Sequence, residues 1–193
     1  MTEQAEDEGL WVRSELLPDG TYGVGISVEA DTAFVLDREQ AVAYAVACFA
    51  RATEADHDTA IMRLLTAEVG VPNEVAAQVV QNDLRPDRPD DHATDPLRFI
   101  PAVGRAKYPR PNAGAFIPIL AMQLNGDQVG QLTPADLRDH GGAVLDVLAA
   151  ADLDAALHRA LVGTVGLDDD KARSVVGELS HHLSEPEPPR RSS

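Results

Sequence analysis

Apolar and polar positions alternate along the first part of the chain, from about residue 10 to residue 36. Val24, Ile26 and Val28 are separated by small or polar residues, which is the period of a strand with one buried face. The turn-forming tripeptides Pro18-Asp-Gly20 and Glu29-Ala-Asp31 divide the segment into three runs. We therefore predict a three-stranded antiparallel β-meander.

From Asp37 onward the apolar spacing becomes helical. The stretch Asp37-Arg-Glu-Gln40 has a capping-box pattern, and apolar residues then recur every three or four positions. A second helical stretch, 55–69, stops at Gly70, which suits a C-terminal cap, and a third covers 73–84. The pattern leaves open whether Asp56 interrupts one long helix or caps a new one, so about three helices are expected.

The same order of elements returns after a segment rich in proline and aspartate, 86–96, which we interpret as a linker. The predicted strands of this second meander span residues 97–103, 115–124 and 128–132. Asn125-Gly126 is a typical hairpin turn, and Thr133-Pro134-Ala-Asp136 has the residues of a helix N-terminus. A second set of helices is expected to follow, up to residue 183.

The two halves also share residues. Segment 55–70 recurs without a gap as 151–166. The residues kept at one constant offset are Ala55, Asp56, Asp58, Ala60, Arg63, Leu65, Val69 and Gly70, which return as Ala151, Asp152, Asp154, Ala156, Arg159, Leu161, Val165 and Gly166. This pattern predicts an internal tandem duplication.

The predicted fold is therefore α+β, with each copy a three-stranded antiparallel β-meander followed by about three α-helices. We expect the two copies to pack as a pseudo-twofold dimer, because each must cover its sheet and its helices. The predicted organisation is a disordered acidic tail (1–9), repeat 1 (10–85), the linker (86–96), repeat 2 (97–183) and a disordered proline-rich tail (184–193).

The composition narrows the possible partners. The 193 residues include 32 acidic and 16 basic residues, a net charge of −16, which argues against direct electrostatic binding to nucleic acid or to an anionic membrane. Cys48 is the single cysteine, so no internal disulfide is expected, and its apolar neighbours suggest a small buried side chain. With no secretory signal and no long apolar run, a cytoplasmic protein is expected.

The repeated acids and arginines are the first candidate site. Asp56, Asp58 and Arg63, with their counterparts Asp152, Asp154 and Arg159, could bind a ligand where the repeats meet. The alternative is structural, because Asp56 and Arg63 are two turns apart on one helix face and a paired Asp and Arg often fixes the packing of helices. The sequence favours the structural interpretation.

A second candidate is the loop that replaces Pro18-Asp-Gly20 in the second copy. It contains Arg105, Lys107, Tyr108 and Arg110 in an otherwise acidic protein. Cations around a tyrosine are typical of interface anchors and could engage an acidic partner or a phosphate. A longer surface turn, held by prolines, explains the same residues equally well.

Catalytic and metal-binding patterns are lacking in the sequence. No histidine is shared by the two copies, and no nucleophile-and-base or metal-ligand spacing is found. We therefore predict no catalytic residues, no metal and no cofactor.

Three stretches carry a resemblance to known proteins. These are Trp11-Val-Arg-Ser-Glu15, Val129-Gly-Gln-Leu-Thr-Pro134 and Ala151-Asp-Leu-Asp-Ala-Ala156. With them the ordered chain resembles small uncharacterised proteins of high-GC actinobacteria and their phages, a group with no known activity. The resemblance implies a bacterial or phage setting and no mechanism.

The leading hypothesis is a non-enzymatic protein that binds another protein, as a regulatory or phage accessory factor. It follows from the duplication, the acidity and the lack of a catalytic set. A homodimer is one assembly that this hypothesis allows. An alternative is a small-ligand-binding protein with its site at the interface of the repeats. A further alternative is an acidic nucleic-acid mimic.

Overall fold

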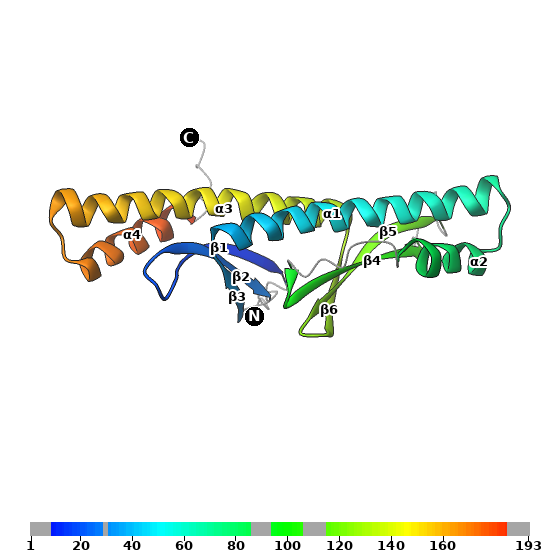
Figure 1. The fold of residues 1–193 in the computed structure, drawn as a ribbon, viewed down its shortest axis with the longest axis horizontal. Helices are drawn as coiled ribbons and strands as arrows, with labels where there is room; N and C mark the ends of the chain where they lie inside the picture. Colours follow the sequence, from blue (N-terminus) through cyan, green and yellow to red (C-terminus); the bar gives the residue numbers. More distant parts are fainter. Residues whose placement is uncertain (1–8, 29–30, 86–93, 106–114, 185–193) are drawn as a thin grey trace, which may run out of the picture. The chain divides into compact units, whose positions relative to one another are not determined.

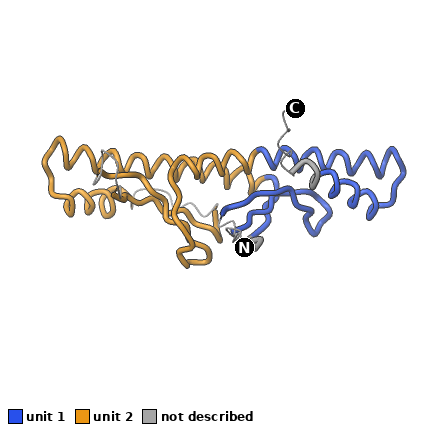
Figure 2. The backbone as a smooth tube through the Cα atoms, turned by 180° about the vertical axis from the view of Figure 1, so that it is seen from behind, with its two compact units in different colours: residues 1–38, 146–193 blue, residues 39–145 orange. Residues whose placement is uncertain are grey.

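The computed structural model describes residues 9–28, 31–85, 94–105 and 115–184. The described residues form two three-stranded antiparallel sheets and four α-helices (Figure 1), so the α+β class is confirmed. The chain divides into two compact units, unit 1 with residues 1–38 and 146–193 and unit 2 with residues 39–145 (Figure 2). Unit 1 therefore combines the sheet of predicted repeat 1 with helices of repeat 2. Unit 2 combines the sheet of repeat 2 with the helices of repeat 1 and the first part of the long helix of repeat 2.

The sheet of unit 1 is the predicted meander. Its strands β1 (Leu10–Leu16), β2 (Tyr22–Val28) and β3 (Asp31–Leu36) are antiparallel neighbours in chain order. Gly20 adopts a φ of 85° in the first turn, a conformation that suits glycine. Val24, Ile26 and Val28 are buried, as their alternation predicts.

The helices of unit 1 come from the end of the chain. They are the second half of α3 (Pro134–Ala160), the π-helical turn η4 (Leu161–Val165) and α4 (Asp169–Ser184). Gly166 has a φ of 78° and lets the chain turn back, while the Leu167 amide donates to the Leu161 carbonyl oxygen at 3.0 Å. Ala172 and Val176 of α4 are fully buried.

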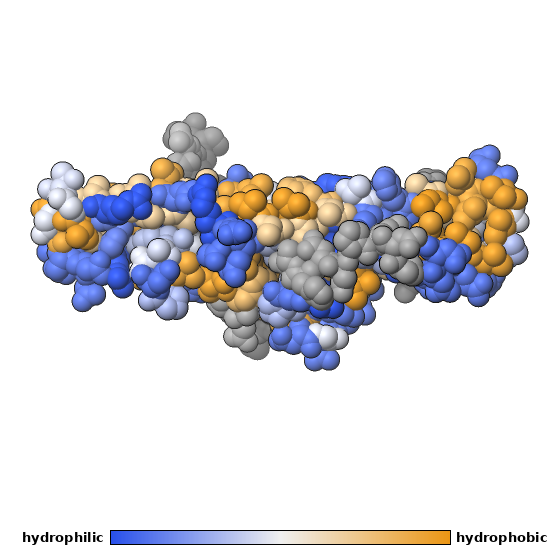
Figure 3. All heavy atoms as spheres, viewed as in Figure 1, coloured by the Kyte–Doolittle hydropathy of each residue, from blue (hydrophilic) through white to orange (hydrophobic). Residues whose placement is uncertain are grey.

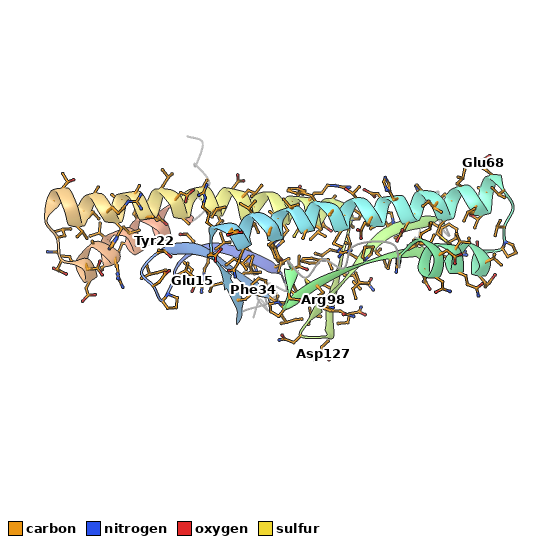
Figure 4. The ribbon with its side chains drawn as sticks, in the orientation of Figure 1. Glu15, Tyr22, Phe34, Glu68, Arg98 and Asp127 are labelled. Carbon is orange, nitrogen blue, oxygen red and sulfur yellow. The ribbon has the colours of Figure 1, made fainter. Side chains whose placement is uncertain are left out.

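The sheet of unit 2 repeats the arrangement. Its strands β4 (Leu97–Arg105), β5 (Phe116–Leu124) and β6 (Asp127–Leu132) are antiparallel neighbours in chain order. Asn125 and Gly126 both have positive φ, 53° and 96°, as a two-residue hairpin turn requires. Asp127 lies at this turn, away from the helices of unit 2 (Figure 4).

A single long helix follows the first meander. Helix α1 (Arg38–Arg63) runs without interruption through Asp56, and continues into the π-helical turn η1 (Leu64–Glu68). After Gly70, with a φ of 76°, come α2 (Asn73–Gln78) and the π-helical turn η2 (Val79–Leu84). The expectation of about three helices after each meander is thus wrong, because two α-helices follow each meander in the part of the chain that the structure describes. No proline or glycine breaks the chain near Asp56, whose carboxylate binds an arginine of another helix instead of capping a new one.

Close packing joins α1 to the first part of α3 in unit 2. A Cβ on Gly141 would lie 3.2 Å from the Cβ of Cys48 and 3.3 Å from the Ala45 carbonyl oxygen, so glycine is needed for the approach. Cys48 is fully buried, as its apolar neighbours predict. Among the described helices none is long and apolar enough to cross a membrane.

The N-terminus of α3 has the predicted cap. Asp136 donates its backbone N–H to the Thr133 hydroxyl at 3.2 Å, and Thr133 donates its own backbone N–H to the Asp136 carboxylate at 3.0 Å. This reciprocal pair satisfies two backbone donors that a helix start would leave unpaired.

Candidate functional site

A pocket in unit 2 lies where the end of α1, the α2–η2 segment and the adjoining ends of β4 and β5 meet. Its volume is about 290 Å³. It is lined by Met62, Asn73, Glu74, Ala77, Val80, Gln81, Arg85, Val103, Arg105 and Phe116. Met62 and Val80 belong to a small core, against which Val103 and Phe116 are packed. Half of these ten lining residues are apolar and half are polar or charged. A concave surface that combines apolar side chains with placed polar groups is typical of a binding site.

Arg85 reaches the pocket from the end of η2 and is held by a buried carboxylate. Its Nε and Nη2 donate to Oδ2 of Asp58 at 3.1 and 3.0 Å. Asp58 is fully buried on α1, whereas the Arg85 side chain is 26% exposed. A buried carboxylate is costly without a partner, so Asp58 fixes the position of the Arg85 guanidinium.

Two further arginines converge on Phe116, the first residue of β5. The guanidinium of Arg105 lies over the Phe116 ring, 5.0 Å from its centre, in a cation–π contact. Arg63, the last residue of α1, donates through Nε and Nη2 to the Phe116 carbonyl oxygen at 3.0 and 2.5 Å. Neither arginine forms an ion pair with any residue that the structure describes.

The charge around the pocket is opposite to that of the chain. Arg63, Arg85 and Arg105 face two acids, Asp58 and Glu74, and Asp58 is already paired with Arg85. The pocket region therefore carries a positive charge within a protein of net charge −16. Such a local reversal attracts an anionic group at close range.

Apolar side chains are also exposed at the turn between η1 and α2. Leu64, Val69 and Val75 are 55%, 63% and 46% exposed. In Figure 3 apolar residues gather over this end of unit 2. Contiguous exposed apolar surface is typical of interaction sites.

The corresponding helical positions of unit 1 have a different chemistry. Met62 and Ala77 of unit 2 correspond to His158 and Arg173 of unit 1. His158 and Arg173 both contact Asp169: His158 Nε2 lies 3.1 Å from its Oδ1, and Arg173 Nη2 lies 2.5 Å from its Oδ2. Tyr22, labelled at the start of β2 in Figure 4, lies 6.2 Å from His158 between ring centres. Burial raises the pKa of the Tyr22 hydroxyl, and the negative charge of Asp154 raises it further. The positive charge of Arg173 acts in the opposite direction. A polar cluster that includes the Arg173–Asp169 ion pair lies where unit 2 has apolar side chains.

The most buried polar pair in unit 2 lies between α1 and α3. The Tyr44 hydroxyl oxygen and His140 Nε2 are 3.0 Å apart. Burial raises the pKa of Tyr44 well above its usual value and lowers that of His140 to about 4. Both groups are therefore neutral at pH 7, and Tyr44 has no exposed surface, which suits packing rather than catalysis.

The repeated acids and arginines have separate partners. Asp56 accepts a hydrogen bond from Nη2 of Arg138 at 2.6 Å, a contact between α1 and α3 of the kind that the structural interpretation predicts, whereas Arg63 binds the Phe116 carbonyl oxygen. In unit 1, Asp152 pairs with Arg38, and Asp154 accepts a hydrogen bond from the Ser14 hydroxyl at 2.8 Å. The six predicted ligand residues are Asp56, Asp58, Arg63, Asp152, Asp154 and Arg159, and none lines the pocket.

Of the predicted partner-binding loop, the structure describes Arg105 alone, and it lies at the pocket. Lys107, Tyr108 and Arg110 lie outside the described residues. Among the described residues, no three His, Cys, Asp or Glu side chains come together in a way that could hold a metal ion.

Sequence reasoning missed Arg85, Met62 and Phe116. Arg85 is the last residue of the predicted repeat 1, and its place at the end of a predicted helix in an acidic chain is the signal that could have indicated a site. Met62 and Phe116 belong to different predicted repeats, so nothing in either repeat indicates that they share a wall.

Comparison with known proteins gives no relative on which to base an assignment. No protein-family model, curated protein or solved structure matches this chain.

Proposed function

We propose that the chain is a non-enzymatic binding protein whose partner is another protein. The observation that carries the proposal is the placement of Arg105 over Phe116 at an apolar pocket, with Arg63 on the same residue and Arg85 in the wall. Arginine and aromatic residues around a desolvated pocket are the usual anchors of protein interfaces. The exposed apolar residues at the η1–α2 turn extend this surface.

The proposal is tested by capture from the native host with two matched variants. Arg105→Gln and Arg98→Gln remove the same charge from the same strand, β4, but Arg98 pairs with Asp95 and does not line the pocket. We expect a partner that the wild type and Arg98→Gln retain and that Arg105→Gln loses. Equal capture by both variants, or turnover of a substrate by the purified chain, would contradict the proposal.

We also propose that the chain arose by tandem duplication and that its repeats pack about a local twofold axis. Tyr44 and His140, which are 96 residues apart, contact each other, as two equivalent residues do beside such an axis. The equivalent aspartates also both pair with an arginine of the other long helix, since Asp56 of α1 pairs with Arg138 of α3 and Asp152 of α3 with Arg38 of α1. The two arginines are one helical turn away from equivalent positions.

Shared irregularities of the backbone support the same proposal. The register shifts between Ile26 and Ser27 in one sheet and between Met122 and Gln123 in the other. The π-helical turns η1 and η4 are each followed within two residues by a glycine of positive φ, Gly70 and Gly166. Bulges and π-turns are retained features within families, so their common offset favours one ancestral unit. An experimental structure in which a twofold rotation fails to superpose the repeats would contradict it.

The bacterial or phage setting and the possible homodimer stay predictions. Genomic neighbourhood tests the first, and sedimentation equilibrium of the full chain tests the second.

A further inference from the structure

We infer that the pocket of unit 2 takes a partner segment in which one apolar side chain stands directly beside one carboxylate. The inference rests on the proposed function and deepens it, because it specifies what the partner presents. Three properties of the pocket lead to it: its size and apolar floor, the position of its cations, and the position of its acid.

The size and lining suit a single side chain. A volume of about 290 Å³ is at the lower limit for small-molecule sites and leaves room for one leucine or phenylalanine with part of its backbone. Met62 and Val80 are almost fully buried behind the pocket, so they form a fixed floor. An apolar group entering here loses contact with water on most of its surface.

Two of the three arginines, Arg63 and Arg105, lie on the sheet side of the pocket, and Arg85 lies at the end of η2. Arg105 ends β4, and Arg63 is held on the first residue of β5. Arg85 donates hydrogen bonds to Asp58 through Nε and Nη2, while its Nη1 has no partner among the described residues. A carboxylate beside the apolar side chain meets guanidinium groups whose positions are already fixed, which lowers the cost of ordering them.

The acid lies on the helix side. Glu74 of α2 lines the pocket together with Asn73 and Gln81. A second carboxylate of the bound segment, placed on the helix side, would be repelled by the negative charge of Glu74. The bound segment is therefore oriented, with its acid toward β4 and β5 and a neutral or basic residue toward α2.

One such site exists per chain by this argument. The helical positions of unit 1 that correspond to Met62 and Ala77 are His158 and Arg173, and both are engaged with Asp169. An apolar side chain placed at these positions has to displace the Arg173–Asp169 ion pair and the imidazole of His158. Binding of one segment per chain is the expected stoichiometry.

The test uses four fluorescein-labelled peptides with the central pairs Glu-Phe, Phe-Glu, Gln-Phe and Phe-Gln between serine and glycine residues. Fluorescence anisotropy with the full chain measures their affinities. We expect one of the two glutamate peptides to bind about tenfold more tightly than its glutamine counterpart, the usual effect of a charge-assisted hydrogen bond. Arg105→Gln removes this difference, and Arg98→Gln preserves it.

Other outcomes overturn the inference in distinguishable ways. Equal affinity of the glutamate and glutamine peptides overturns the role of the carboxylate. Displacement of the bound peptide by 3-phenylpropionate at an equal concentration identifies a small-molecule site instead. If no peptide binds while capture of a partner still depends on Arg105, the inference fails and the proposed function stands. If that capture fails as well, both fall. A thermal melt of Arg105→Gln that matches the wild type, and partial rescue by Arg105→Lys, exclude misfolding as the cause.

Discussion

Removing Arg85 tests how the pocket wall is held together. In Arg85→Met the apolar stem of the side chain is kept, but the fully buried carboxylate of Asp58 loses both hydrogen bonds from the guanidinium. Breaking a buried ion pair from one side costs about 3–5 kcal/mol. Because the Arg85 side chain is 26% exposed and water partly replaces it, we expect the lower end, about 3 kcal/mol. For a chain of this length that lowers the melting temperature by about 6–12 °C.

Urea unfolding followed by circular dichroism at pH 7 measures the loss of stability. The control is Arg98→Met, which breaks the pair with Asp95. The Arg98 and Asp95 side chains are 45% and 39% exposed, so this loss should cost only about 0–1 kcal/mol. The double variant Asp58→Leu/Arg85→Met removes both charges and should recover most of the stability. If Arg85→Met costs no more than Arg98→Met, the buried pair does not hold the pocket wall and the reasoning is refuted.

Two further predictions concern the packing of α1 and α3. Gly141→Ala should destabilise the protein by about 1 kcal/mol or more, because a Cβ there lies 3.2 Å from the Cβ of Cys48. A Cβ at Gly142 meets nothing within 4 Å, so Gly142→Ala should stabilise the protein by up to about 1 kcal/mol. Equal effects of the two variants in thermal melts would contradict the close approach of the helices at Gly141. His140 has its pKa lowered by burial from 6.5 to about 4, so the unfolded chain takes up a proton first as the pH falls, and stability is lost between these two values. The loss should reach about 2 kcal/mol at pH 5, and His140→Gln, measured by urea unfolding at pH 7.5 and pH 5, should remove this contribution.

Much of the fold could be predicted because its determinants are local. The alternation of Val24, Ile26 and Val28 gives the buried face of β2, and the positive φ of Gly70 gives the end of the first helical segment. The reciprocal bonds of Thr133 and Asp136 follow from side chains three residues apart. Each of these features is decided within one or two turns of chain, so the sequence contains the full argument for it.

The partners across the fold could not be predicted in the same way. A helical period shows which face of α1 is apolar, but not that Asp56 meets Arg138 rather than Arg63. The division into units is of this kind too, since residues 146–193 join the first sheet rather than the second. Nor does any local pattern indicate that Arg85, Arg105 and Phe116, from three separate segments, line one pocket.

The most direct test of the central claim compares Arg105→Gln with Arg98→Gln in partner capture by the full chain. The account predicts that the bound protein is lost from Arg105→Gln and retained by Arg98→Gln, because only Arg105 lies over Phe116 at the pocket while Arg98 pairs with Asp95 on the same strand. Retention of the partner by both variants would contradict the claim that this pocket is where the protein binds.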